Sequence, residues 1–408
     1  MIRVWADGLP AGILDRFESR GSTFAYDLAV DQQREVSLTM PARTASWNIS
    51  LGLAPIFEMN LPEGALRERL RLTFAKATGS FDDIDLLTIV GRSQLGRLRY
   101  TGLAENLNDD VPFQSVDEIL ANRRGGDFYR YLIERFAAYS GVSGVQPKFL
   151  VRDQDNFSAG GAPQRPLSST FRAATHIVKF WDAAEFTQLA ANEFFCLKVA
   201  EKCGLDVPPH RLSDDGSALV IERFDLRPDG SYRGFEDFCV LNARRTDEKY
   251  RGSYETQIMR RFQQFARSSA VVSESVKLFT LIALNCALRN GDAHLKNFGV
   301  LYDSVQGEAR LAPVYDVVTT TVYLPKDQMA LNLNGTNRWP AAKELIRFAE
   351  SKSLATRHDL LQVFERIQDA MSEVTRNMDA YCRDHVEFRE IEGRITEEWN
   401  KGRHSVSV

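Results

Sequence analysis

Two aspartates and one asparagine near residue 300 have the spacing of a site that transfers phosphate. Asp292 is followed five positions later by Asn297, and Asp316 comes nineteen positions after Asn297. In a protein-kinase-type site, the first aspartate accepts a hydroxyl proton, the asparagine binds one Mg²⁺, and the second aspartate binds the metals that bridge the ATP phosphates. We therefore predict Asp292 as the catalytic base and Asn297 and Asp316 as Mg²⁺ ligands. His294 is either a phosphate contact or an ordinary polar loop residue.

A helix is predicted immediately before Asp292. Residues 273–290 contain the apolar run 278–284, with Ser273 as a plausible N-cap and Gly291 as a plausible C′ residue. Asp292 would then lie in the loop just after a buried helix, which is a rigid support for a catalytic side chain.

A hairpin is predicted immediately after Asn297. Residues 298–302 and 309–315 are strand-like and are separated by a turn-like segment. If they pair as antiparallel strands, Asn297 and Asp316 lie at the same open end of the hairpin. Asp and Asn are also common as caps and turn residues, but the agreement of spacing, helix and hairpin favours a functional site.

The sequence also offers a candidate phosphate-binding loop. Residues 140–148 are rich in Gly and Ser, and small residues allow backbone N–H groups to approach a phosphate closely. We expect Ser143, Gly144, Val145 and Gln146 to contact ATP. The loop lacks a Gly-x-Gly-x-x-Gly pattern, so a plain turn before a strand is the alternative.

Three further segments follow in kinase order. Lys179 lies near the end of the strand predicted at 175–180. A lysine on an apolar strand favours an anionic partner. Glu193, on the next predicted helix, is the candidate for that partner. The alternative is an edge-strand lysine that reaches water. The strand predicted at 217–222 leads into a polar connector, where Glu222 and Phe224 are candidates to contact adenine.

Composition narrows the class of protein. The chain has 408 residues, 44% hydrophobic and 26% charged, with a formal net charge of −4. These values are typical of a soluble globular protein and argue against nucleic-acid binding through bulk charge. The five cysteines lack paired short spacings, which indicates reduced thiols in the cytoplasm. We expect no signal peptide and no membrane span.

Three units are expected along the chain. Residues 1–105 form a small α/β unit with strands at 2–6 and 24–30, an alternating segment at 35–40 and a helix at 63–77. Residues 106–240 mix helix and strand patterns and carry the Gly/Ser loop. Residues 241–408 are mostly helical.

Eight short motifs occur in order: Pro62-Glu63-Gly64, Gly144-Val145-Gln146-Pro147-Lys148, Thr175-His176-Ile177-Val178-Lys179, Asn192-Glu193, Glu222-Arg223-Phe224-Asp225, Glu236-Asp237-Phe238-Cys239, Asp292-Ala293-His294-Leu295-Lys296-Asn297-Phe298 and Tyr315-Asp316. As a set they resemble the HipA-type serine/threonine kinases, the toxin halves of bacterial toxin–antitoxin pairs. The resemblance covers essentially the whole chain.

The resemblance implies an α+β, protein-kinase-like fold with two lobes: a small α/β N-terminal domain (1–105), a β-rich ATP lobe (106–240) and a helical catalytic lobe (241–408). It implies ATP and Mg²⁺ as cofactors, with Lys179 on the phosphates and Glu222 and Phe224 at the adenine. The protein substrate would be an aminoacyl-tRNA synthetase, notably the glutamyl-tRNA synthetase. A HipB-like helix-turn-helix antitoxin would bind the kinase and link it indirectly to operator DNA.

Such kinases also phosphorylate a serine of their own loop, which ejects the loop and switches the kinase off. Many members carry that serine seven residues before the loop lysine, where this chain has Gly141. We therefore expect autophosphorylation at Ser143, with Ser140 as the second candidate. Added charge beside the ATP phosphates would repel them.

Two other classes of protein share parts of this pattern. A kinase of a small molecule or lipid could use the same active-site logic, and would phosphorylate that molecule rather than a protein. A catalytically weak relative could act with an antitoxin as a co-repressor. The presence of Lys179, Asp292, Asn297 and Asp316 together argues against the second class, because a binding module has no chemical need for them.

Overall fold

A computed structural model describes the chain from residue 1 to residue 408 except for residues 19, 29, 79–80, 108–109, 122–125, 145, 159–171, 182–185 and 267–269. Val145 of the predicted loop therefore lies outside the described residues.

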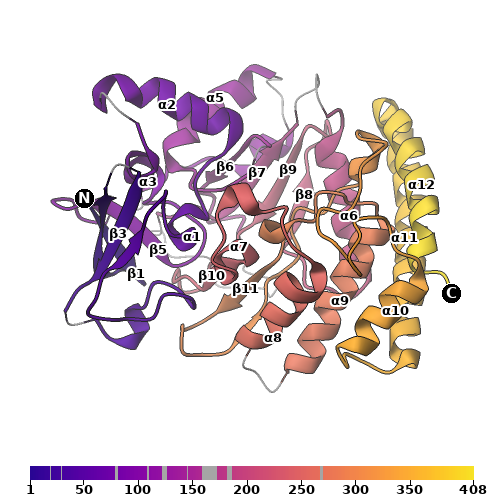
Figure 1. Ribbon diagram of the computed structural model, residues 1–408. Helices are drawn as coiled ribbons and strands as arrows, with labels where there is room; N and C mark the ends of the chain where they lie inside the picture. Colours follow the sequence, from indigo (N-terminus) through magenta and orange to yellow (C-terminus); the bar gives the residue numbers. More distant parts are fainter. Residues whose placement is uncertain are drawn as a thin grey trace.

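The N-terminal part of the chain is a five-stranded antiparallel sheet with strand order β4-β3-β2-β1-β5, shown in indigo and purple in Figure 1. Ile2, Val4 and Ala6 alternate inward along the first strand, as expected for a sheet with one covered face. The elements are β1 (Ile2–Ala6), β2 (Leu9–Phe17), β3 (Gly21–Tyr26), β4 (Trp47–Ile49), α1 (Pro55–Glu58), α2 (Gly64–Thr78), α3 (Asp83–Val90) and β5 (Leu98–Gly102).

Several sequence-based expectations for this part need correction. The strand expected at 24–30 is β3, which ends at Tyr26. The alternating segment 35–40 forms no strand, only one bridge between Ser37 and Met40. Its alternation arises because Val36 and Met40 pack into the core while Glu35 and Ser37 are hydrogen-bonded. β2 was not predicted, because Pro10, Gly12 and Asp15 disfavour strands.

A second antiparallel sheet, with strand order β6-β7-β9-β8, carries the predicted loop and lysine. β7 lies between β6 and β9, and its register sets Lys148 directly opposite Lys179. The elements are α4 (Val116–Ala121), α5 (Gly126–Phe136), β6 (Lys148–Val151), β7 (His176–Phe180), α6 (Leu189–Lys202), β8 (His210–Leu212) and β9 (Ala218–Glu222). The helix predicted to carry Glu193 is α6, which begins at Leu189.

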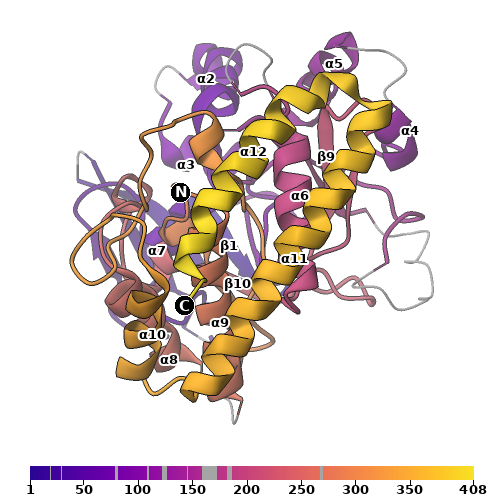
Figure 2. The ribbon, with the colours of Figure 1, turned by 90° about the vertical axis from the view of Figure 1, so that its right-hand side faces the viewer.

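The C-terminal part is mostly helical, as predicted, and contains one small sheet with strand order β10-β11-β12. Figure 2 shows the long helices α11 and α12 in front of α6 and α9, and α11 contacts all three of the others. The elements are β10 (Gly234–Asp237), α7 (Phe238–Leu241), α8 (Arg261–Phe265), α9 (Val271–Ala287), β11 (Gly299–Tyr302), β12 (Ala309–Leu311), α10 (Ala342–Ser351), α11 (Arg357–Asp384) and α12 (Arg389–Gly402).

The predicted hairpin is confirmed, because β11 and β12 pair antiparallel. The second strand is shorter than expected and ends at Leu311, two residues before Pro313. Since proline has no N–H to donate to the ladder, the chain leaves the sheet there and continues to Asp316 as an extended segment.

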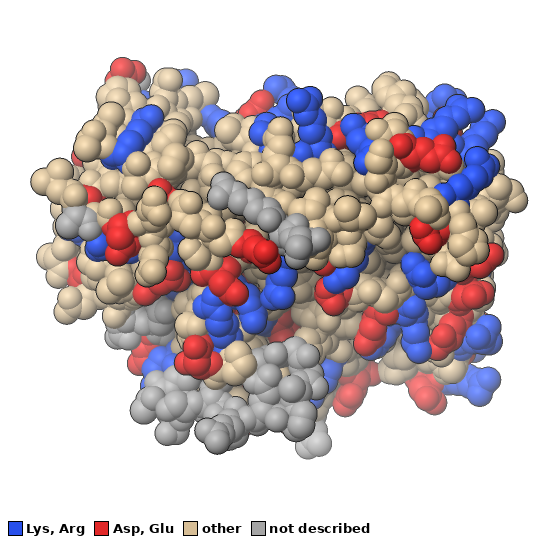
Figure 3. All heavy atoms as spheres, turned by 90° about the horizontal axis from the view of Figure 1, so that it is seen from below, with Lys and Arg blue, Asp and Glu red and all other residues tan. Residues whose placement is uncertain are grey.

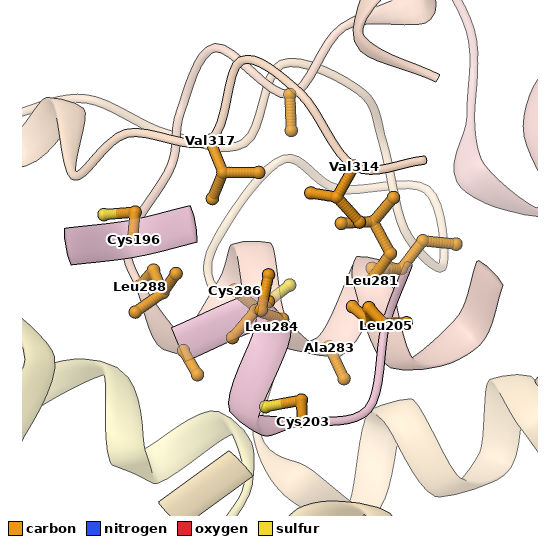
Figure 4. Close-up of a cluster of buried hydrophobic side chains, with 14 of the residues drawn as sticks. Cys196, Cys203, Leu205, Leu281, Ala283, Leu284, Cys286, Leu288, Val314 and Val317 are labelled. Carbon is orange, nitrogen blue, oxygen red and sulfur yellow. The ribbon is translucent and has the colours of Figure 1, made fainter. Parts of the chain in front are cut away.

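Two hydrophobic cores meet at the second sheet. Leu219 and Ile221 of β9 belong to the core of the helical part, and Ala218 and Val220 belong to the core that also contains the N-terminal sheet. In Figure 4, α6, α9 and the segment after β12 pack their apolar side chains together. All five cysteines are buried, free thiols, and burial raises the pKa of Cys286 to about 12.

The surface carries mixed charge. On the face shown in Figure 3, basic and acidic side chains are interspersed, in keeping with the small net charge. In the part of the chain that the structure describes, no helix is both long and apolar enough to cross a bilayer.

Candidate active site

The loop that carries Asp292 is fixed by the end of α9. Arg289 has a left-handed backbone (φ 59°), and its N–H donates to the Cys286 carbonyl while the Asn290 N–H donates to the Asn285 carbonyl. This pair of bonds is a Schellman motif, in which Arg289 takes the C′ position that we predicted for Gly291. The helix also begins earlier than predicted, with Ala270 rather than Ser273 as its N-cap.

Gly291 is needed for a different reason. A Cβ atom at this position would lie 2.1 Å from a carboxylate oxygen of Asp327. Its N–H donates to Thr320 Oγ1 at 2.8 Å, and Thr320 Oγ1 in turn donates to Asp327 at 2.5 Å. The turn before Asp292 is therefore packed tightly against the segment 320–327.

Asp292 presents its carboxylate at the surface of the site, with its side chain about half exposed (52%). The hydroxyl of Tyr250 donates to Asp292 Oδ1 at 2.6 Å. Burial raises the pKa of the Asp292 carboxyl, although the Tyr250 hydrogen bond and the Lys249 ammonium partly oppose this. His294 is buried beside it, and burial together with two neighbouring lysines lowers the pKa of His294 to about 3, so its ring is neutral.

Asn297 is oriented by its own amide nitrogen. Its Nδ2 donates to the Asp292 carbonyl at 2.8 Å and to the Asp316 carbonyl at 3.5 Å. Among the described residues, none donates to its Oδ1. The side chain thus joins the two aspartate-bearing segments and keeps one amide oxygen available to a cation.

Asp316 lies between two lysines. Its backbone is left-handed (φ 53°), which is uncommon for a residue with a side chain and is found more often at functional sites. Lys179 Nζ hydrogen-bonds to Asp316 Oδ1, and Lys148 Nζ lies 3.9 Å from Asp316 Oδ2. Burial alone would raise the pKa of Asp316, but the two ammonium groups outweigh it and hold the pKa below its usual range.

Lys179 also contacts Glu193. Its Nζ lies 2.5 Å from Glu193 Oε1, and both side chains are almost fully buried. Burial lowers the pKa of Lys179, but Asp316 and Glu193 outweigh this and raise the pKa above its ordinary value. Lys148 and Lys179 are directly opposite on neighbouring strands, an arrangement that is repulsive unless anions lie beside it. Lys148 was not among the predicted site residues.

The Gly/Ser loop closes over these lysines. Gly144 has φ +122°, and a Cβ atom there would lie 2.5 Å from Lys148 Nζ. The Ser143 hydroxyl donates to Glu63 Oε1 at 2.7 Å, and Gln146 Nε2 donates to the Phe180 carbonyl at 2.9 Å. The loop is therefore tied both to β7 and to the N-terminal part of the chain.

Ser140 has a different environment from Ser143. It is completely buried, and its hydroxyl donates to the Phe136 carbonyl at 2.7 Å and accepts from the Leu150 N–H at 3.0 Å. Ser143 is only half-buried. In this conformation only Ser143 faces the cavity.

The proposed base, metal ligands, lysines and loop residues surround one cavity of about 490 Å³. Its charged lining consists of four lysines and six carboxylates: Lys148, Lys179, Lys249, Lys296, Glu63, Glu193, Asp237, Asp292, Asp316 and Asp327. Its apolar lining includes Ile177, Ile221, Phe224, Phe235 and Tyr315. A cavity whose lining combines apolar side chains with lysines and oxygen ligands has the chemistry that a nucleotide needs.

The two residues predicted at the adenine are separated. The Phe224 ring lines the cavity and stacks on Tyr315, with the ring centroids 5.7 Å apart and 20° between the planes. The Glu222 carboxylate instead accepts hydrogen bonds from the N–H and hydroxyl of Ser158, at 3.1 and 2.9 Å. It does not line the cavity.

Two polar residues that the spacing argument did not find come from distant segments. Glu63 Oε2 accepts from Lys249 Nζ at 3.0 Å across 186 positions of sequence, and Tyr250 reaches Asp292 across 42 positions. Neither contact follows a short spacing. In the sequence, only the motif Pro62-Glu63-Gly64 of the family resemblance pointed to Glu63.

The donor set fits Mg²⁺. Mg²⁺ prefers oxygen ligands and is usually bound by one or two protein groups together with phosphate oxygens. Asp316 supplies a carboxylate that stays ionised, and Asn297 supplies its available amide oxygen. The described residues include no cluster of three or more His, Cys, Asp or Glu that could hold a metal. Water and phosphate oxygens would complete the coordination of a bound Mg²⁺.

Two family assignments account for most of the chain. Residues 2–101 match the HipA N-terminal domain, and residues 140–380 match the HipA-like C-terminal domain. Two curated relatives from Sinorhizobium fredii are named putative kinases. Y4mE is 35% identical over 345 residues, which cover 79% of this chain and 78% of the relative. Y4dM is 27% identical over 375 residues, which cover 85% of each.

One solved structure is similar over the full length. It is the Shewanella oneidensis MR-1 toxin–antitoxin complex of HipA, HipB and operator DNA, with a TM-score of 0.65, 17% sequence identity and 100% coverage of both chains. At this identity the similarity concerns the fold alone. It confirms the predicted α+β, kinase-like fold with an additional N-terminal domain.

Proposed function

Because this chain belongs to the HipA family, we propose that it is an ATP- and Mg²⁺-dependent serine/threonine-protein kinase that acts as the toxin of a toxin–antitoxin pair. One observation carries the proposal. Lys179, Asp292, Asn297 and Asp316 surround a single cavity, with a buried carboxylate against the lysine and an amide that links the two aspartate segments. These are the groups that phosphoryl transfer requires.

Each residue has a role that follows from its contacts. Asp292, half exposed at the cavity, accepts the proton of the attacking hydroxyl. Lys148 and Lys179 bind phosphate oxygens, while Glu193 keeps Lys179 charged and in place. Asn297 and Asp316 hold Mg²⁺, which when bound neutralises phosphate charge. Neutral His294 remains available as a hydrogen-bonding partner for a phosphate.

The remaining nucleotide contacts belong to the loop and to the apolar lining of the cavity. Ser143, Gly144 and Gln146 cover the phosphates, and Val145 is included by its position in the motif. Phe224 packs against the adenine ring. For Glu222, whose carboxylate is engaged by Ser158, we propose a contact through its backbone.

We propose the three units of the chain as functional divisions: an N-terminal domain at 1–105, an ATP lobe at 106–240 and a catalytic lobe at 241–408. The first supplies Glu63 to the site, the second the loop and lysines, and the third the base and the metal ligands.

Autophosphorylation is proposed at Ser143 rather than at Ser140. Ser143 lies at the cavity with its hydroxyl bonded to Glu63, whereas Ser140 is completely buried. A phosphate on Ser143 would repel both Glu63 and the ATP phosphates, which favours release of the loop.

The partners follow from the family. The similar Shewanella protein was solved with HipB and operator DNA, so we propose a HipB-like antitoxin as the partner of this chain, with DNA reached only through it. The proposed substrate is a cytoplasmic protein of translation, such as the glutamyl-tRNA synthetase or another aminoacyl-tRNA synthetase.

The test is transfer of labelled γ-phosphate to bacterial lysate proteins and to the chain itself, with the sites identified by mass spectrometry. Label on Ser143 and on a discrete lysate protein, absent with Asp292→Asn, is expected. Label on a small molecule or lipid would make the chain a kinase of that class. No transfer from verified unphosphorylated protein would leave the small-molecule kinase and the co-repressor as the two alternatives.

A further inference from the structure

Tyr250 is the nearest side-chain neighbour of the proposed base that none of the roles above uses. It follows the short 3-10 helix Thr246–Glu248 and precedes Gly252, whose backbone is left-handed. Its side chain lines the cavity, yet the residue is about half exposed (51%). It therefore lies at the mouth of the site, beside Asp292.

The contact with Asp292 has the geometry of a bound acceptor. A catalytic base must lie roughly 2.6–3.2 Å from the hydroxyl whose proton it takes. The Tyr250 hydroxyl lies 2.6 Å from Asp292 Oδ1 and donates its proton to that oxygen. Burial and the neighbouring Asp292 carboxylate raise the pKa of the Tyr250 phenol, so it remains a protonated donor.

The ring is supported on its inner side. Its edge packs against His294, with the ring centroids 4.9 Å apart. The preceding residue, Lys249, is bound to Glu63, which also accepts from Ser143 of the loop. The segment that presents Tyr250 is thus connected to the Gly/Ser loop through two side-chain contacts.

We propose that the Tyr250 hydroxyl occupies the position of the phosphoacceptor hydroxyl on Asp292, and that an acceptor must displace it before transfer. Tyr250 is thereby a positioning residue, because its hydroxyl stays hydrogen-bonded to Asp292 until an acceptor arrives. While it is bound there, Asp292 is less available to take a proton from water. This proposal rests on the proposed kinase function.

The first test uses Tyr250→Phe, which keeps the ring and removes only the hydroxyl. With MgATP and no other protein, the acceptors are water and Ser143 of the chain itself, so the release of inorganic phosphate is the measure of transfer to water. We expect the kcat of ATP hydrolysis to rise about three- to tenfold, the change expected for removing one competing hydrogen bond, with the KM for ATP unchanged. Adding Asp292→Asn should abolish the increase.

Tyr131→Phe is the matched control. Tyr131 lies on α5, outside the cavity lining, and is also about half exposed. Its hydroxyl accepts a hydrogen bond from Arg135 at 2.8 Å. It should leave hydrolysis unchanged. An unchanged or lower kcat in Tyr250→Phe, or an altered KM for ATP, would overturn the proposal. A purely structural role predicts a lower Tm without a rise in kcat.

A second measurement does not need turnover. Fluorotyrosine placed at position 250 should show a fluorine NMR shift when Asp292 is replaced by Ala, whereas the same label at position 131 should not. If neither wild type nor Tyr250→Phe transfers phosphate to protein or to water, the proposed function fails, and this resonance alone decides whether Tyr250 engages Asp292. No shift at position 250 would overturn the contact.

Discussion

At the scale of single residues, the site is organised by a small number of opposed charges. Lys148 and Lys179 face each other across two strands, and Asp316 lies between them while Glu193 holds Lys179 from the other side. The two carboxylates balance the charge of the two lysines, so both ammonium groups are held in place without a nucleotide. The lysines are thus positioned before the nucleotide arrives, which reduces the cost of ordering them on binding.

Lys179→Met tests this arrangement through stability. It leaves the Glu193 carboxylate buried without the Lys179 ammonium. Removing one partner of a buried ion pair lowers the free energy of unfolding by about 3–5 kcal/mol. We expect the free energy of unfolding in urea to fall by about this amount. Lys198→Met, on the same helix as Glu193, breaks an exposed pair with Glu201 and should cost less than about 1 kcal/mol. Equal losses in the two variants would contradict the account.

At the scale of elements, the support of the catalytic loop is a crossing of two helices. α9 ends at Ala287, just before the Schellman turn that leads to Asp292. Gly402, the last residue of α12, packs so closely on this end that a Cβ atom would lie 1.9 Å from the Ala287 carbonyl oxygen. The turn is held further by Arg289, whose guanidinium lies 4.4 Å from the centre of the Trp339 ring.

Gly402→Ala should therefore disturb the support of the site from a distance. The overlap forces the helix ends apart, and overpacking of this kind costs about 1–3 kcal/mol. Gly393→Ala lies in the same helix, where a Cβ atom meets nothing within 4 Å, and should be neutral or stabilising by about 0.5–1 kcal/mol. Thermal unfolding of both variants measures the difference. Equal Tm values would mean that the close approach is unimportant.

The elements also show what a sequence can predict. The spacing of Asp292, Asn297 and Asp316 is local, because one helix end and one hairpin determine it, and periodicity and turn residues indicate both. The contacts of Tyr250 and Glu63 depend on how separate segments pack, and residue spacing carries no sign of that. Two expectations failed, for β2 and for the C′ position, which Arg289 occupies. In both cases tertiary packing and hydrogen bonding outweighed the strand and helix-end preferences of the residue types.

At the scale of the whole molecule, the N-terminal sheet is joined to the rest through shared apolar packing and buried polar contacts. Glu236 of β10 accepts from Ser37 Oγ at 2.9 Å, from the Leu38 N–H at 2.8 Å and from Tyr302 OH at 2.7 Å. Arg223 donates to the Gln94 carbonyl at 2.7 Å. The N-terminal part also forms one wall of the site, because Met59, Asn60, Glu63 and Leu95 line the cavity.

The Glu236 contact predicts a dependence of stability on pH. Burial raises the pKa of Glu236 from its ordinary value of 4.5 to about 7. Between these values the folded protein binds more protons than the unfolded chain, so this group's contribution to stability falls as the pH rises from about 4.5 to 7. One pKa unit corresponds to about 1.4 kcal/mol.

Urea unfolding measures how much free energy of unfolding each protein loses between pH 5 and pH 8. We expect this loss to be smaller in Glu236→Gln than in the wild type, by on the order of 2–3 kcal/mol. Glu308→Gln, at an exposed position in the turn before β12, should behave as the wild type. The same pH dependence in all three proteins would show that Glu236 does not titrate in this range.

The central claim is that Asp292 serves as the base of an ATP-dependent phosphotransferase. The most direct measurement is the initial rate of Mg²⁺-dependent γ-phosphate transfer by purified wild type and by Asp292→Asn, alongside the binding of MgATP to both. We predict that Asp292→Asn reduces the rate of γ-phosphate transfer by about 10²–10⁴-fold, the usual contribution of a general base. Its affinity for MgATP should stay within a few-fold of wild type. Equal transfer rates in the two proteins, or no Mg²⁺-dependent transfer by either, would contradict the account.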